Sequence, residues 1–418
     1  MGFFKLTIRD VPLHDKTVLV RADYNVPLSD EGAIDDDLRI RASLPTLRYL
    51  LERNCKVIVM SHLGRPEGRD PKLSLQPIAQ RLGELLDQDV RFINDCKGDR
   101  VVQSVKRTPQ GSILLLENLR YYKEEEADDH AFASAIATAT SARYLVQDGF
   151  GVVHRAHAST HAITLCIPSI AGLLVEREYT TITKAMNHPD RPLVAVMGGA
   201  KVSDKIALVE RFIDVADKII IGGAMANTFL AYKGFSVGSS KVEEDQHAEL
   251  DRIYKVAKEK VGDAVDEFIV LPRDLAVADT IGMDAERRIT SVDQMAERDI
   301  ALDLGDASIE HMIESIQGAK TVIWNGTMGY AEEPNFAHGS ARLALALATH
   351  PDVTSIIGGG DTADFALKWD GHEGKSFTHV STGGGASLEL MAGDKLPGIE
   401  SLLDARGEVG YTSSNNHK

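Results

Sequence analysis

Short apolar runs alternate with amphipathic stretches from one end of the chain to the other. Several of these runs are continuous rather than alternating, which is typical of strands buried on both faces of a parallel sheet. The predicted strands are Thr17–Val20, Lys56–Met60, Val90–Ile93, Ser112–Leu116, Tyr144–Gln147, Leu193–Met197, Lys218–Ile221, Phe268–Leu271, Thr321–Trp324, Thr354–Ile357 and Thr378–Val380.

The stretches between these runs have helical periodicity. They include Asp37–Arg53, Leu75–Leu86, Ser203–Val215 and Ser340–Ala348. A strand, a helix and a second strand in succession form the βαβ unit, whose strands are parallel. The sequence therefore predicts the α/β fold class, with doubly wound, mostly parallel sheets.

The chain has 418 residues, a length that predicts two or three domains. Pro168 and Pro189 bracket a helical stretch, Ala171–Met186. Since proline interrupts regular structure, this stretch is expected to connect two domains. The expected division is residues 1–167 for the first domain, 168–190 for an interdomain helix and 191–397 for the second domain.

Composition excludes several classes of protein. The formal net charge of −16 argues against binding to nucleic acid or to an anionic membrane, because both require a basic surface. No window reaches the roughly 18 apolar residues of a membrane span, and residues 1–10 do not resemble a signal peptide. The three cysteines form no CxxC pair, which favours a reducing compartment. We expect a cytoplasmic protein, and a monomer, since no apolar stripe demands a dimer.

Basic residues recur just after the predicted strands of the first half. They are Arg21, Arg39, His62, Arg65, Arg120, His154, Arg155 and His157. The carboxyl ends of parallel strands line the ligand crevice of such sheets, and guanidinium groups bind carboxylates and phosphates through paired hydrogen bonds. A basic residue at any one strand end is explained equally well as a solvated turn. Basic residues at four strand ends are not explained in this way. The first half is therefore predicted to bind a small acid.

Arg39 adds to this prediction because it lies in the first turn of the helix that Asp35–Asp37 opens. A cation there opposes the helix dipole. A ligand-facing role is therefore favoured for Arg39.

Glycine occupies the equivalent turns of the second half. The turns are Gly198–Lys201, Gly222–Gly223, Asn325–Gly326, Gly358–Asp361 and Gly383–Gly385. Each alone is explained as a tight turn or a helix C-cap. Together they favour a nucleotide whose phosphates rest on backbone amides at helix N-termini. Lys201 and Lys205 are predicted to lie one helical turn apart and to point the same way, and Asp361 is the natural carboxylate for Mg²⁺.

Three other site types are alternatives to this interpretation. Residues 358–363 formally match the GxGxxA turn of a nicotinamide-dependent dehydrogenase, but the next strand ends at Ser381–Gly383 without the acidic residue that holds the ribose. No GxxxxGK[ST] motif occurs. His154, His157 and His161 have metal-like spacing, although no helical pattern or cysteine supports a metal site, and hydrogen-bonded histidines are the simpler interpretation.

A set of motifs spans the chain from about Leu6 to Leu403. They are VRADYNVPL, SHLGRP, LLLENLRYY, HRAHAST, GGAKVSDKI, IIGGAMANTF, WNGTMG, GGGDTA and STGGGASLELM. In this order they resemble the phosphoglycerate kinase family. The resemblance implies two α/β domains with a cleft between them, and a C-terminal segment, residues 398–418, that returns to the first domain. It also implies Mg-dependent, reversible phosphoryl transfer between 1,3-bisphosphoglycerate with ADP and 3-phosphoglycerate with ATP, a step of glycolysis and gluconeogenesis.

The resemblance further implies a role for individual residues. The phosphoglycerate would be held by Asp23, Asn25, Arg39, His62, Arg65, Arg120 and Arg155. The nucleotide would be held by Lys201, Lys205, Gly223, Glu332, Gly359, Gly360, Asp361 and Thr362. Asp361 would bind the Mg²⁺ and Glu332 the ribose. The sequence departs from the family pattern at Thr327, which replaces a proline, and at His161–Ala162, but no charged ligand-binding group is lost.

The chemistry of this reaction needs no general base, because a carboxylate is already ionised at neutral pH. Catalysis then depends on positioning two anions and on neutralising charge, roles that we expect for Arg39 and Lys201. A catalytically silent scaffold of the same fold is the remaining alternative. It would be favoured by the loss of Arg39, Lys201 or Asp361, and all three are present.

Overall fold

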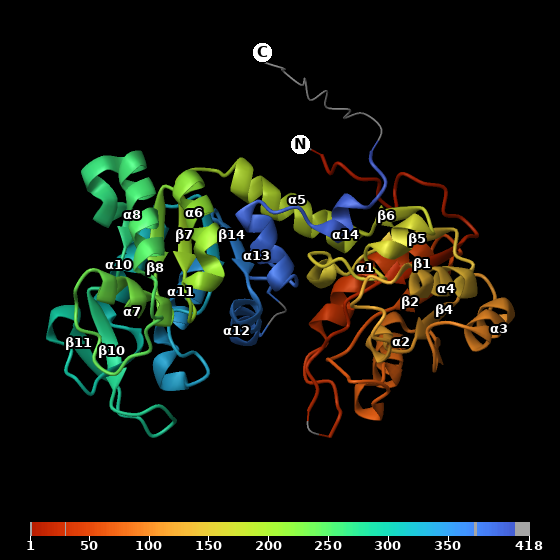
Figure 1. The fold of residues 1–418 in the computed structure, drawn as a ribbon, viewed down its shortest axis with the longest axis horizontal. Helices are drawn as coiled ribbons and strands as arrows, with labels where there is room; N and C mark the ends of the chain where they lie inside the picture. Colours follow the sequence, from red (N-terminus) through yellow and green to blue (C-terminus); the bar gives the residue numbers. More distant parts are fainter. Residues whose placement is uncertain (1, 30, 372–373, 406–418) are drawn as a thin grey trace, which may run out of the picture. The chain divides into compact units, whose positions relative to one another are not determined.

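The computed structural model describes residues 2–29, 31–371 and 374–405, and the chain divides into two compact units. Unit 1 comprises Met1–Thr180 and Lys395–Lys418, and unit 2 comprises Thr181–Asp394. Each unit contains a six-stranded parallel sheet whose strands alternate with helices along the chain (Figure 1). The predicted α/β fold class is therefore confirmed.

The sheet of unit 1 has the strand order β3-β4-β2-β1-β5-β6. Its strands are β1 (Thr17–Arg21), β2 (Lys56–Met60), β3 (Val90–Ile93), β4 (Ile113–Leu116), β5 (Tyr144–Gln147) and β6 (Ser169–Ala171). Its helices are α1 (Leu38–Leu51), α2 (Gln76–Leu86), α3 (Asp99–Arg107), α4 (His130–Thr140) and α14 (Pro397–Glu400), and α5 (Leu173–Asn187) begins in unit 1 and ends in unit 2.

Helices cover both faces of this sheet, which accounts for the continuous apolar runs. Along β2, Val57 and Val59 pack in the cluster that contains residues of α1 and α2. Ile58 and Met60, which point to the opposite face, pack in the cluster that contains residues of α3 and α4. All four side chains are fully buried. An apolar residue is thus required at each of the four positions from Val57 to Met60.

The two ends of the described chain meet in unit 1. The Leu6 amide donates to the Leu403 carbonyl at 2.7 Å, and the Leu403 amide donates to the Ser169 carbonyl at 2.9 Å. The buried Lys5 ammonium lies 2.6 Å from an Asp404 carboxylate oxygen. Residues 406–418 of the predicted returning segment lie outside the described residues.

The main sheet of unit 2 has the strand order β15-β14-β13-β7-β8-β9, and a smaller antiparallel sheet has the order β11-β10-β12. The strands are β7 (Leu193–Met197), β8 (Lys218–Ile221), β9 (Ile269–Val270), β10 (Asp274–Ala278), β11 (Arg288–Ser291), β12 (Ile300–Leu304), β13 (Thr321–Asn325), β14 (Thr354–Gly358) and β15 (His379–Val380). The helices are α6 (Ile206–Val215), α7 (Gly223–Tyr232), α8 (His247–Val261), α9 (Val265–Phe268), α10 (Asp306–Gln317), α11 (His338–Ala348), α12 (Gly360–Asp370) and α13 (Gly385–Ala392).

The antiparallel sheet and β6 were not predicted. Strand β12 contains the buried Asp303, which interrupts its apolar run, and the residues of β11 are at least partly exposed. Aspartate is depleted in strands, so the local pattern does not indicate a strand at β12. Within the described ranges, the chain has no helix that is both long and apolar enough to cross a membrane.

Candidate active site

Four neighbouring strands of unit 1, in the order β4-β2-β1-β5, end at the same edge of the parallel sheet. The segments that follow them therefore lie side by side. These segments carry the predicted substrate residues Arg120, His62, Arg65, Asp23, Asn25 and Arg155, and Arg39 comes from the start of α1. The fold thus brings the predicted basic residues of the first half to one edge of one sheet.

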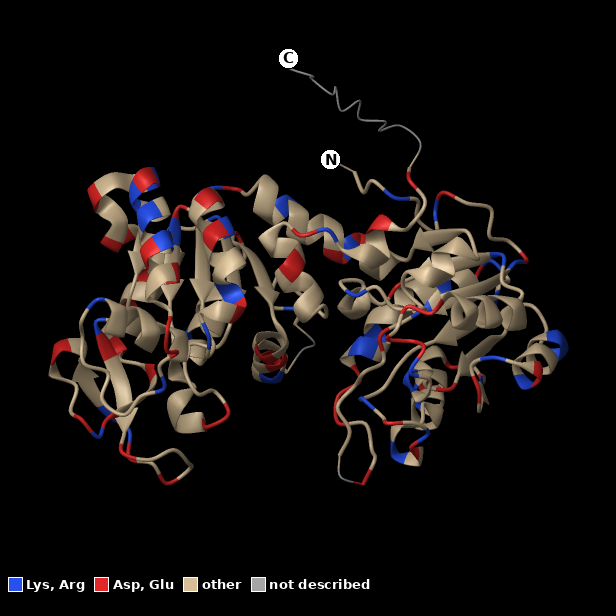
Figure 2. Cartoon of the chain, viewed as in Figure 1, with Lys and Arg blue, Asp and Glu red and all other residues tan. Residues whose placement is uncertain are grey.

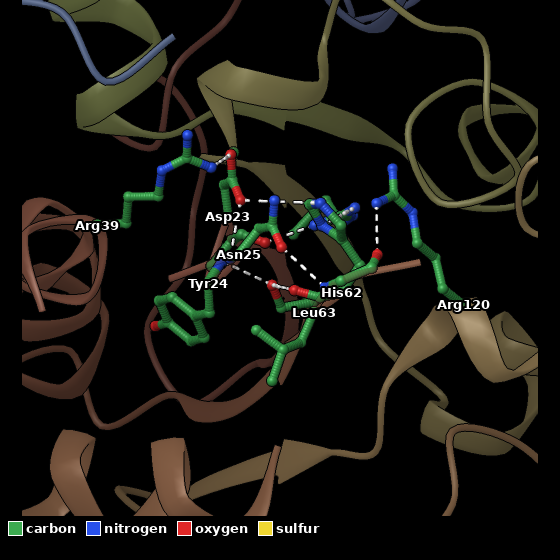
Figure 3. A network of polar contacts seen from close by, with 12 residues as sticks. Asp23, Tyr24, Asn25, Arg39, His62, Leu63 and Arg120 are labelled. Atoms are coloured by element: carbon green, nitrogen blue, oxygen red, sulfur yellow. Dashed lines mark hydrogen bonds and ion pairs between the residues drawn. The ribbon is translucent and has the colours of Figure 1, made fainter. Parts of the chain in front are cut away.

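Arg39 and Asp23 form an ion pair at this edge (Figure 3). The Arg39 Nη1 atom donates to Asp23 Oδ2 at 2.8 Å, and the Asn25 backbone amide donates to Asp23 Oδ1 at 3.0 Å. Burial would raise the pKa of Asp23, but the Arg39 charge and the Asn25 amide lower this pKa to about 2. The carboxylate is therefore ionised at neutral pH.

His62 lies beside this pair and is almost fully buried. Its Nδ1 atom is 3.2 Å from Arg21 Nη2. Because a guanidinium can only donate, Nδ1 must accept, and the hydrogen of the neutral ring is on Nε2. Burial, together with the Arg21 charge, places the pKa of His62 well below its usual value. His62 therefore offers a neutral Nε2–H donor, located 4.0 Å from Asp23 Oδ1.

Arg21 is a buried residue that contacts His62. Only 1% of its surface is exposed, which excludes it from contact with a ligand. Its Nε atom donates to Ser159 Oγ at 2.7 Å, and Nη2 lies 3.8 Å from Glu125 Oε1. Glu125 also accepts a hydrogen bond from the Ser159 amide at 3.0 Å. The contact between Glu125 and Arg21 was not predicted, because a run of three glutamates is typical of a solvated surface.

Gly64 joins two further predicted residues. Its amide donates to Asn25 Oδ1, and its carbonyl accepts from Arg120 Nη1, both at 2.8 Å (Figure 3). Its φ of +62° suits glycine, and a Cβ here would lie 2.9 Å from a Leu73 methyl carbon. Arg120 is further restrained by Glu126, whose Oε1 atom lies 3.1 Å from Arg120 Nε.

Arg65 and Arg155 are exposed at the same edge of the sheet. A cavity of about 470 Å³ is lined by three cationic residues, Arg65, Arg120 and Lys123, and by three acidic ones, Glu67, Glu124 and Glu126. Figure 2 shows acidic and basic residues interspersed along the helices of both units. The lining thus carries both signs of charge, and it does not by itself select an anion.

Two of the three histidines with metal-like spacing have side-chain partners in the protein. His154 Nε2 accepts from Arg155 Nε at 3.2 Å, and His161 Nδ1 lies 2.6 Å from Asp128 Oδ2. Burial lowers the pKa of His157 to about 4. In the described part of the chain, no group of three His, Cys, Asp or Glu residues is placed to hold a metal ion.

In unit 2 the neighbouring strands β14, β13, β7 and β8 end in glycine-containing loops. These loops bind one another through their backbones. The amide of Gly198 donates to Asn325 O at 2.9 Å, that of Gly199 to Thr327 O at 3.0 Å, and that of Gly223 to Met328 O at 2.9 Å. The prediction that glycine amides at these turns receive phosphate is therefore wrong for these three residues.

The glycines instead allow the loops to approach closely. Gly223 has a φ of +61°, and a Cβ on it would lie 2.6 Å from the Gly199 nitrogen. A Cβ on Gly198 would lie 2.1 Å from the Thr327 carbonyl oxygen. Thr327, which departs from the family pattern, closes its own turn because its hydroxyl donates to the Gly329 carbonyl at 3.0 Å.

The N-terminus of α12 differs from these loops. Gly360 and Asp361 occupy its first turn and are exposed, and the first amides of a helix have no intrahelical acceptor. Gly359, with a φ of +92°, precedes the helix, and a Cβ on it would lie 2.9 Å from Asn325 Nδ2. Thr362 is buried, and its hydroxyl accepts from the Gly326 amide at 2.7 Å. Thr362 therefore fixes α12 to the loop after β13. The exposed amides at the start of the helix are those of Gly360 and Asp361, which precede Thr362.

The two predicted lysines lie in different surroundings. Lys205 Nζ donates to the Gly198 carbonyl at 2.7 Å and to the Asn325 carbonyl at 3.2 Å, and burial lowers its pKa to about 8. Lys201 is exposed, in the loop before the 3₁₀ turn Ser203–Lys205. The prediction that both lie one turn apart on a helix is wrong, because α6 begins only at Ile206. Glu332 is exposed in the loop between β13 and α11.

A family model described as phosphoglycerate kinase matches residues 8–394. The chain belongs to the phosphoglycerate kinase family. It is similar to the phosphoglycerate kinase of Dictyoglomus turgidum, with 46% identity over 96% of this chain and 98% of that protein. The cytosolic phosphoglycerate kinase of Triticum aestivum is 44% identical over 96% of this chain and 98% of that protein.

The solved structure of the phosphoglycerate kinase from Coxiella burnetii has the same fold. The TM-score is 0.82 at 34% identity, and the match covers 95% of this chain and 98% of that one. The chain is thus a phosphotransferase with a carboxyl group as acceptor. It catalyses the reversible phosphoryl transfer of phosphoglycerate kinase, between 1,3-bisphosphoglycerate with ADP and 3-phosphoglycerate with ATP.

Proposed function

We propose that unit 1 binds the phosphoglycerate and unit 2 the nucleotide in this reaction. One observation carries the proposal: neighbouring strands of unit 1 end in cationic side chains, whereas those of unit 2 end in glycine loops and the α12 N-terminus. Cationic side chains match the carboxylate and phosphate of a small acid. An exposed helix N-terminus matches a polyphosphate.

In unit 1, Arg65, Arg120 and Arg155 bind the anionic groups of the phosphoglycerate, and His62 contributes its Nε2–H. Asp23 is an ionised carboxylate and repels anions. It therefore accepts a hydrogen bond from the hydroxyl group of the substrate, which is the substrate's only hydrogen-bond donor. Asn25 acts beside it, held through its Oδ1 atom by the Gly64 amide.

In unit 2, the triphosphate lies at the start of α12, against Gly359, Gly360 and the first turn. Lys205 keeps one ammonium hydrogen for a phosphate, since two carbonyls take the others. Gly223 contacts the nucleotide with its Cα surface, because its amide is already bonded. Glu332 accepts from the ribose hydroxyls.

Asp361 is the proposed Mg²⁺ ligand, and its surroundings fit that ion. Magnesium usually binds one or two carboxylates together with phosphate oxygens. Asp361 is an exposed carboxylate in the same helical turn as the amides assigned to phosphate. When bound, Mg²⁺ neutralises negative charge on the nucleotide phosphates.

Arg39 and Lys201 are assigned to the transferred phosphoryl group. The attacking carboxylate is ionised at neutral pH, so no side chain has to remove a proton. What the protein must supply is alignment of the two anions and positive charge for the moving group. We also propose that the protein acts as a monomer and that it acts in the cytoplasm. The name of the cytosolic wheat relative supports the cytoplasmic location.

The division of binding predicts different kinetic effects in unit 2. Replacement of Glu332 or Lys205 by alanine raises KM for ATP by about 10- to 100-fold, as for the loss of a charged hydrogen bond, and leaves KM for 3-phosphoglycerate unchanged. Lys205→Ala also lowers the unfolding midpoint, because two buried carbonyls lose their donor.

The measurement is phosphoglycerate-dependent ADP formation from ATP, with Mg²⁺ and with a chelator. Activity in the chelator equal to that with Mg²⁺ would reject the role of the ion. A raised KM for 3-phosphoglycerate alone in either variant would contradict the division.

A further inference from the structure

One carboxylate fastens the loop that carries Lys201. Glu243 Oε2 accepts hydrogen bonds from the Val202 amide at 2.7 Å and from the Ser203 amide at 3.0 Å. The Ser203 hydroxyl donates to the other oxygen, Oε1. Three donors directly after Lys201 are thus bound by one side chain that lies 41 positions from Val202 in the sequence.

These contacts fix the backbone of Lys201. The Val202 amide shares a peptide plane with the Lys201 carbonyl, so a bond to that amide sets the direction in which the chain leaves Lys201. The Val202 side chain is fully buried. On the other side, the Gly199 amide donates to Thr327 O at 3.0 Å, and the Gly199 carbonyl accepts from Met225 N at 2.9 Å. The loop is therefore held before and after Lys201.

The Lys201 side chain, by contrast, is exposed and makes no hydrogen bond or ion pair with any other described residue, although its charge helps to lower the pKa of Glu243. Its direction depends on the backbone beneath it. An exposed ammonium group with a fixed backbone is suited to meet a ligand, whereas a fully mobile loop would lose part of that alignment.

Glu243 is itself fixed to α7. Its amide donates to Thr228 Oγ1 at 3.1 Å, and Asn227 Nδ2 donates to the Lys241 carbonyl at 3.2 Å. Partial burial raises the pKa of Glu243, but the Ser203 hydroxyl, the Ser203 and Val202 amides and the Lys201 charge together lower it below its usual value. The carboxylate is ionised at neutral pH and is anchored to a helix of the main fold.

We propose that Glu243 is a positioning residue for phosphoryl transfer, which orients Lys201 toward the transferred group by holding the Val202 and Ser203 amides. The inference rests on the role proposed for Lys201. It assigns Glu243 no contact with the substrate, so its effect must pass through Lys201.

Glu243→Ala is expected to lower kcat by about 10- to 100-fold, as for a misplaced catalytic group, with KM for ATP changed by less than about threefold. Glu243→Gln keeps a carbonyl oxygen for the two amides and an NH₂ that donates to Ser203 Oγ, so it is expected to stay within about threefold of the parent. Glu244→Ala, at the exposed neighbouring carboxylate, is the matched control and retains parental kcat.

The deciding measurement is a double-mutant cycle that adds Glu243→Ala to Lys201→Ala. If Glu243 acts through Lys201, the second substitution has little further effect on kcat. An equal loss in both backgrounds overturns the inference and leaves the role of Lys201 intact. Parental turnover in Lys201→Ala alone rejects the role of Lys201 and the inference with it. If Glu243→Ala does not fold, a large kcat loss in folded Glu243→Gln contradicts the inference.

Discussion

The Arg39→Ala variant is expected to lose about 10²–10³-fold in kcat, because it lacks a charged donor to the transferred phosphoryl group. The substitution also leaves the buried Asp23 carboxylate without the guanidinium 2.8 Å away, so the pKa of Asp23 rises. Steady-state kinetics with saturating 3-phosphoglycerate and Mg-ATP measures the first effect, and the unfolding midpoint shows whether the second has damaged the fold.

Two further variants separate these effects. Arg39→Lys keeps a cation near Asp23 but loses the planar fork, and an intermediate kcat is expected. Arg41→Ala removes an arginine of the same helix that is bonded to Asp37 at 2.7 Å, and it should leave kcat unchanged. A folded Arg39→Ala protein with near-parental turnover would remove Arg39 from the mechanism.

The Lys201→Ala variant is expected to show a similar loss of about 10²–10³-fold in kcat, again from missing charge on the transferred group. Its unfolding midpoint should equal that of the parent, because the Lys201 side chain has no hydrogen bond or ion pair within the described residues. Kinetic and thermal measurements on one preparation therefore isolate the catalytic effect more cleanly than for Arg39.

Lys255→Ala is the matched control, since it removes an exposed lysine from α8. Both kcat and stability should match the parent. If folded Lys201→Ala kept parental turnover, the proposal that Lys201 neutralises charge on the transferred group would be wrong.

Burial on both faces explains why the parallel strands were predictable. Strand β2 has the predicted bounds, Lys56–Met60, because each face of the sheet demands apolar residues there. Strand β12 was missed because Asp303 lies within it, and its carboxylate is satisfied by the Gly339 amide of α11 at 3.0 Å. The contact between Asp303 and Gly339 joins residues far apart in the sequence, so a local pattern cannot predict it.

The site was predictable to a similar extent. Local patterns placed His62 and Arg120 after strands, but the strand order that makes those ends neighbours comes from long-range pairing. The pattern singled out Arg39 by its place in the first turn of a helix, but it did not show that Arg21 is buried and supports His62. Arg21 ends β1 and resembles the other basic residues at strand ends, so only packing shows that it is inaccessible to a ligand.

Local sequence patterns also could not predict how the glycine turns of unit 2 use their backbone amides. Sequence reasoning favoured free amides at Gly198 and Gly223, whereas the structure uses these amides to bind neighbouring loops. Glycine is required there for close backbone approach, a need that produces the same sequence signature as a phosphate-binding turn. Glu243 was missed because its partners, Val202 and Ser203, lie far away in the sequence.

The most direct test of the division of substrates is calorimetric titration of each ligand into two variants with exposed substitutions, Arg155→Ala in unit 1 and Glu332→Ala in unit 2. We predict that Arg155→Ala raises Kd for 3-phosphoglycerate by about 10- to 100-fold and leaves Kd for Mg-ATP unchanged, and that Glu332→Ala does the reverse. Weakening of the same ligand by both variants would contradict the assignment of one substrate to each unit.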